Sequence, residues 1–120
     1  MQRRIPTNPE LANTIGYLKR KGRQLQTPLW LAVANNLAKS RRSRIVLNLG
    51  QVSRHAQEGD TVVVPGKVLS SGEPIGKLTI AAFKFSPIAL VKVEKAGGRC
   101  IPILRLVEEN PNGNKVKLLR

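Results

Sequence analysis

The side chains best suited to bind a ligand in this sequence are basic, and most of them come in two groups. The groups are Lys19, Arg20, Lys21 and Arg23, and then Lys39, Arg41, Arg42 and Arg44. The planar guanidinium of Arg donates paired hydrogen bonds to phosphate oxygens, and Lys adds a compact positive charge. These residue types at this spacing therefore indicate binding of phosphate groups.

The charge of the whole chain supports this interpretation. The 120 residues hold 21 Lys and Arg against 7 Asp and Glu, a net charge of +14. Eleven of the basic residues precede residue 58, where Glu10 is the only acid, and eight of the eleven are Arg. Outside the two groups they are Arg3, Arg4 and Arg54. Such one-sided charge repels itself unless a polyanion neutralises it, so we predict that these eleven residues bind a polyanion. A solvated surface kept for solubility is the alternative.

The sequence contains no recognisable combination of residues for a catalytic or metal-binding site. With one Cys and one His, Cys100 and His55, the chain has no internal disulfide, thiolate zinc site or histidine triad. The segment GEPIGK at 72–77 is one residue too short between its glycines for a phosphate loop, and Leu78 replaces the Ser or Thr that holds Mg²⁺. We predict no enzyme, no cofactor and no small-molecule substrate. Cys100 is predicted to be a small core residue, and His55 either a plain surface residue or a phosphate contact.

We predict no membrane partner, because no segment joins a basic face to a strongly hydrophobic, aromatic-tipped one, as interfacial helices do. No apolar run approaches the ~20 residues that a bilayer span needs, and the basic N-terminus has no apolar stretch typical of a secretory signal. We expect a cytoplasmic protein.

Two helices are predicted to carry the basic groups. Pro9 and Glu10 start a helix over 9–21 that stops at Gly22, and Thr27 with Pro28 starts a second, more buried helix that ends near Lys39. Each basic group then lies at a helix C-terminus, where cations are favoured by the helix dipole.

From Ile45 onward the sequence alternates between short apolar segments and helical ones. The strands are predicted in IVLNL, TVVVP, GKVL and KLTIAAF and at 115–119, and the helices at 51–58, after Ser86-Pro87, and at 102–109. Three times a strand leads into a helix that ends at a glycine, over 45–59, 78–97 and 99–113. We predict an α/β fold in one domain, 1–120, with a basic helical hairpin at 1–40 and an α/β core at 41–120.

The kind of polyanion follows from where the charge lies. In a helix-turn-helix the second helix reads bases with its first residues, but here those are Pro28, Leu29 and Trp30, which are typical of a core. Structured RNA, read through backbone and shape, fits better than DNA.

For Phe83 and Phe85 core packing is favoured over base stacking. A DNA-associated regulator and a small RNA-processing enzyme remain alternatives.

Three segments together resemble a known family. IVLNLGQVSRHAQEGD, TVVVPGKVLSSGEP and KLTIAAFKFSPIALVKVEKAGG are similar to the archaeal and eukaryotic large-subunit ribosomal protein eighteen family, and the resemblance spans nearly the whole chain. The chain ends at Arg120 without the long basic tail of eukaryotic members, so it resembles the archaeal form.

The resemblance carries several expectations. It implies an irregular superhelix of strand and helix turns, with a core shared with bacterial large-subunit ribosomal protein fifteen. It implies a place on large-subunit ribosomal RNA beside other ribosomal proteins, with no catalysis and no cofactor. On this view Arg41, Arg42 and Arg44 are the chief phosphate contacts carried over from the family.

Overall fold

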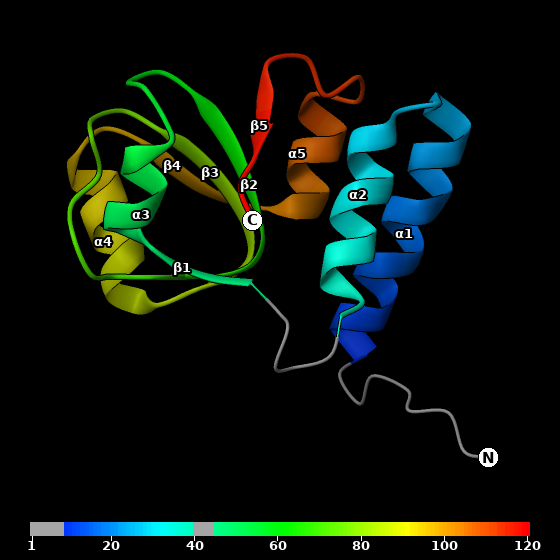
Figure 1. The fold of residues 1–120 in the computed structure, drawn as a ribbon, viewed down its shortest axis with the longest axis horizontal. Helices are drawn as coiled ribbons and strands as arrows, with labels where there is room; N and C mark the ends of the chain where they lie inside the picture. The colour runs from blue at the N-terminus through cyan, green and yellow to red at the C-terminus, as the bar shows by residue number, and fades with distance from the viewer. Residues whose placement is uncertain (1–8, 40–44) are drawn as a thin grey trace.

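The computed structural model describes residues 9–39 and 45–120, in which two helices are followed by five strands and three further helices (Figure 1). The helices are α1 Pro9–Leu25, α2 Pro28–Leu37, α3 Leu49–Arg54, α4 Pro87–Lys95 and α5 Ile103–Glu109. The strands are β1 Ile45–Asn48, β2 Thr61–Leu69, β3 Thr79–Phe85, β4 Arg99–Pro102 and β5 Val116–Leu118. The predicted α/β class with an N-terminal helical hairpin is confirmed.

The strands form one sheet in which every pairing is parallel. The order is β1-β2-β3-β4, and β5 also pairs with β2. Strand β3 runs along one edge of β2, while β1 pairs with its residues 66–69 and β5 with its residues 61–63. The strands β1 and β5 therefore share the other edge of β2, which brings the C-terminal end of the chain close to the β1–α3 region.

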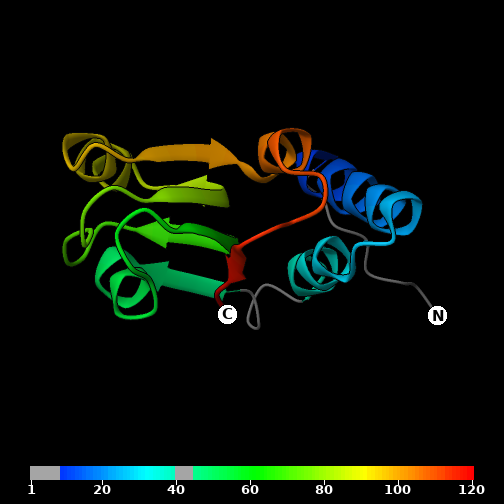
Figure 2. The same cartoon turned by 90° about the horizontal axis from the view of Figure 1, so that it is seen from above.

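Helices cover both faces of the sheet, as the two views show (Figures 1 and 2). On one face α1, α2 and α5 pack around Trp30, with Val63, Ala81 and Ile101 as their sheet partners. On the other face α3 and α4 pack on Val62, Val64 and Ile80. Because neighbouring strand residues point to opposite faces, each near-continuous apolar strand serves both cores.

The hairpin departs from the sequence prediction at Gly22. The first helix does not stop there but runs to Leu25 and ends at Gln26, whose φ is +52°. Gly22 is buried, and a Cβ on it would lie 2.8 Å from the Leu31 Cγ of α2. The glycine is thus needed for the close approach of two helices and not for a helix end.

Two boundaries in the α/β part were also predicted wrongly. TVVVP and GKVL are one strand, β2, because a register shift between Val64 and Lys67 absorbs the proline and the glycine. Helix α3 begins at Leu49 and ends at Arg54, earlier than the predicted 51–58. Its start is fixed by the Gln51 side chain, which accepts a hydrogen bond from the Asn48 backbone N–H at 2.9 Å.

Each of the three predicted units contains a strand followed by a helix and then a glycine, but only α4 ends close to its glycine, because α3 ends at Arg54 and α5 at Glu109. Gly59, Gly97 and Gly113 follow α3, α4 and α5 and all have positive φ. At the start of α4 the Ser86 hydroxyl accepts a hydrogen bond from the Ala89 N–H at 3.2 Å, as its sequence position predicts. In the described part of the chain, no helix combines the length and the apolar character needed to cross a membrane.

Candidate nucleic-acid interface

The first basic group occupies the last turns of α1. Arg20 and Arg23 are exposed, and Lys19 and Lys21 are partly exposed. The Arg20 Cζ lies 6.0 Å and the Lys21 Nζ 5.8 Å from the centre of the Tyr17 ring, which packs against the core. These contacts, at the outer limit of a cation–π interaction, hold two long side chains near the ring. Arg23 lies in the last turn of α1, at the negative end of the helix dipole. We call Lys19, Arg20, Lys21 and Arg23 the helix-end cluster.

The other predicted site residues do not join this cluster. Since α1 and α2 are antiparallel, exposed Lys39, just beyond α2, lies at the opposite end of the hairpin (Figure 1). Seventeen residues make α1 about 25 Å long. Exposed Arg54 ends α3, across the sheet from the hairpin. The remaining predicted residues, Arg3, Arg4, Arg41, Arg42 and Arg44, fall outside the described residues.

The ion pairs between described residues all use cations of the second half of the chain. Within residues 9–39 and 45–120 the ion pairs are Lys84–Glu10, Lys92–Glu73, Arg99–Glu109, Arg105–Glu109 and Lys117–Asp60. None of the helix-end cluster, Lys39 or Arg54 forms an ion pair with another described residue. Their charge therefore remains available to an external anion.

The pairs also change the chemistry of the acids that make them. Hydrogen bonds from Arg99, at 2.8 Å, and from Arg105, at 3.0 Å, lower the pKa of Glu109 to about 2. Glu109 thereby ties α5 to the start of β4. The hydrogen bond from Lys117, together with the Gln57 N–H, lowers the pKa of Asp60. These carboxylates act as structural partners of cations.

The aromatic and thiol candidates of the sequence lie in or against the core. Trp30 is fully buried and donates from Nε1 to the Pro111 carbonyl at 2.8 Å. Phe83 and Phe85 are half-buried and pack against opposite cores, as favoured from the sequence. Cys100 packs against the α3–α4 core, and burial, with a smaller effect of Glu94, raises the pKa of its thiol to about 11. His55 is exposed at the end of α3.

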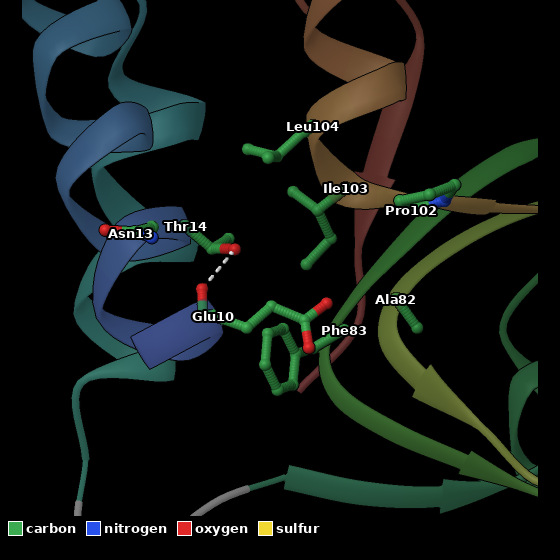
Figure 3. Close-up of a pocket in the computed structure, with 8 residues that line it drawn as sticks. All are labelled: Glu10, Asn13, Thr14, Ala82, Phe83, Pro102, Ile103 and Leu104. Atoms are coloured by element: carbon green, nitrogen blue, oxygen red, sulfur yellow. Dashed lines mark hydrogen bonds between the residues drawn. The ribbon is translucent and has the colours of Figure 1, made fainter. Parts of the chain in front are cut away.

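Two cavities differ in the charge of their linings. One, of about 430 Å³, lies between α1, β3 and the start of α5 and is lined by Glu10, Asn13, Thr14, Phe83 and further apolar side chains (Figure 3). Its charged lining residue is an acid, so it is poorly suited to phosphate. The other, of about 380 Å³, is lined by Arg54, His55 and Arg120, with Gln51 and the leucines 47, 118 and 119.

These features define a class of protein. The molecule is a small basic α/β protein in which the helix-end cluster, Lys39 and Arg54 form no ion pair with another described residue. No cluster of His, Cys, Asp and Glu able to hold a metal ion occurs among the described residues.

Comparison with known proteins gives the family. The family model of the ribosomal proteins 60S L18 and 50S L18e matches residues 11–120, and the chain belongs to this family. The large ribosomal subunit protein eL18 of Methanospirillum hungatei is 40% identical over 119 residues, covering 99% of this chain and 98% of its own. The eL18 protein of Methanopyrus kandleri is 41% identical, and the match covers 95% of this chain and 94% of that protein. The eL18 protein of Methanococcus maripaludis is 40% identical, and the match covers 99% of this chain and 99% of that protein.

The comparisons confirm two expectations drawn from the sequence. The resemblance to the archaeal form of this ribosomal family is correct, because the similar proteins are archaeal and match over nearly the full chain. The family is one of ribosomal structural proteins and not of enzymes, so the expectation of no catalytic activity also holds.

Proposed function

We propose that this protein is a structural constituent of the cytoplasmic large ribosomal subunit, where it binds and pins ribosomal RNA through phosphate contacts of Arg and Lys. The binding residues are Arg3, Arg4, Lys19, Arg20, Lys21, Arg23, Lys39, Arg41, Arg42, Arg44 and Arg54. Neighbouring large-subunit proteins are the other partners. The relatives named above carry the large subunit in their names, which supports the setting.

One observation carries the mechanism. Every ion pair among the described residues uses a cation of the second half of the chain, where five of the ten cations are paired, while the helix-end cluster, Lys39 and Arg54 have no ion pair within the described residues. RNA phosphates that approach these cations displace condensed counterions, and the gain in counterion entropy drives binding. Phosphate contact of this kind fixes the position of the protein and carries little sequence information.

Salt dependence of RNA binding tests this mechanism. If about six phosphates are engaged, the logarithm of the affinity for folded large-subunit RNA should fall with the logarithm of salt concentration with a slope of about −4 to −5. A slope near zero would contradict phosphate binding.

Removal of two exposed charges makes the test specific. R20Q/R23Q should weaken binding and flatten the slope by about one for each phosphate that the variant no longer binds. The matched control K77Q/K95Q removes two exposed cations of the second half that lack an ion pair among the described residues, and should bind like the unaltered protein. Equally weakened binding in both variants would mean that affinity follows net charge alone.

A further inference from the structure

The cavity between α3 and the C-terminal segment joins residues that are far apart in sequence. Leu119 donates its N–H to the Val63 carbonyl at 3.0 Å and packs in the same core as Leu49, Val52 and Ala56. This contact sets Arg120 beside the end of α3, so that Arg54, His55 and Arg120 line one cavity of about 380 Å³. The pairing of β5 with β2 is the reason for the juxtaposition.

The lining of this cavity suits both the charged and the apolar parts of a nucleotide. Arg54 and Arg120 offer two guanidinium forks, and His55 and Gln51 add ring and amide hydrogen-bonding groups. No Asp or Glu side chain is among the described residues that line the cavity. The leucines at 47, 118 and 119 supply apolar surface against which a ribose or base can pack.

The cavity is separated from the helix-end cluster by the sheet. The residues of α3 pack in the core on one face, and α1 and α2 pack on the other. In both views α3 lies away from the hairpin (Figures 1 and 2). A phosphate held at the cavity and one held at the helix-end cluster therefore contact opposite sides of the molecule.

From this arrangement we infer that the cavity is a second RNA site, in which Arg54, Arg120 and His55 hold the phosphate of an unpaired nucleotide while the leucines contact its sugar or base. The inference rests on the proposed function and deepens it. RNA bound there and RNA bound at the helix-end cluster are held on opposite faces of the sheet, so that the protein bridges two RNA segments.

His55 gives a direct reporter because it is the only histidine of the chain. The ring-proton NMR signals of His55 are followed while the folded protein is titrated with a single-stranded pentamer of uridylate. We expect a saturable shift of these signals in the unaltered protein and in R20Q/R23Q. In R54Q/R120Q the affinity read from His55 should fall about tenfold or more, because two charged hydrogen bonds are removed. The control K77Q/K95Q carries the same net charge and should retain the shift.

Several outcomes would overturn the inference. They are a His55 signal that does not move, a shift that survives in R54Q/R120Q, and a shift equally large and equally tight with inorganic phosphate, which would make the cavity a general anion site. Binding of folded large-subunit RNA, measured in parallel, separates the two proposals. If that binding persists and depends on Arg20 and Arg23 while His55 is silent, only the second site is wrong. If it is absent, the proposed function itself fails.

Discussion

Among single residues, Glu109 shows most clearly how this protein uses its few acids. It accepts hydrogen bonds from Arg99 and Arg105, which come from different elements, and its pKa is lowered to about 2. A carboxylate with a lowered pKa stabilises the folded state above its ordinary pKa of 4.5. That contribution disappears as the pH falls from about 4.5 to about 2.

This linkage predicts how Glu109→Gln behaves with pH. The variant should be less stable than the unaltered protein near neutral pH, and the difference should shrink as the pH falls below about 4.5. Urea unfolding of both proteins at a series of pH values measures it. Glu108→Gln is the control, since Glu108 is exposed and makes no ion pair with a described residue. A stability difference for Glu109→Gln that stays constant down to the acid limit of folding would contradict this role.

The role of a residue was predicted from the sequence where that role depends on the type of its side chain. It was missed where the role depends on residues far away in the chain. Trp30 and Cys100 pack as their apolar character indicates. The link from Glu109 to Arg99 depends on the geometry of β4 and α5, ten positions apart in the chain. The position of Arg120 beside Arg54 depends on a strand pairing between distant segments. No local pattern in the sequence marks either contact.

At the scale of elements, helix starts marked by a cap residue and a following proline were predicted correctly, whereas the ends of α1 and α3 were not. Pro28 and Pro87 occupy the first position of α2 and α4, where a proline loses no hydrogen bond. Gly22 was predicted to be a helix end because glycine commonly terminates helices. Its actual role is contact with Leu31 of the neighbouring helix, and an interhelical contact leaves no trace in the local sequence.

Two glycines of α1 give a matched test of that contact. Gly22→Ala should destabilise the protein by about 1–3 kcal/mol, because the added methyl overpacks against Leu31. Gly16→Ala lies in the same helix with no neighbour nearer than 3.9 Å, and should stabilise it by about 0.5–1 kcal/mol through helix propensity. Chemical unfolding of both variants measures the two effects. Equal stabilisation by both would show that the helices do not approach closely at Gly22.

The whole molecule divides its charge between two purposes. Five cations of the second half pair with acids, whereas the helix-end cluster, Lys39 and Arg54 lack such pairs within the described residues. The sequence predicted this surplus in the first half of the chain. It did not predict that the surplus would be spread over both ends of the hairpin and both faces of the sheet, because that depends on how α1, α2 and α3 are arranged in three dimensions.

Sedimentation of the native protein through a sucrose gradient, at moderate and then at high salt, tests the ribosomal function most directly. The charge distribution predicts that the protein travels with large subunits at moderate salt and is released as salt rises, since screening and counterion competition weaken phosphate contacts. Sedimentation as a free small protein at moderate salt would contradict a structural role in the large subunit. Retention unchanged at high salt would contradict attachment through phosphates.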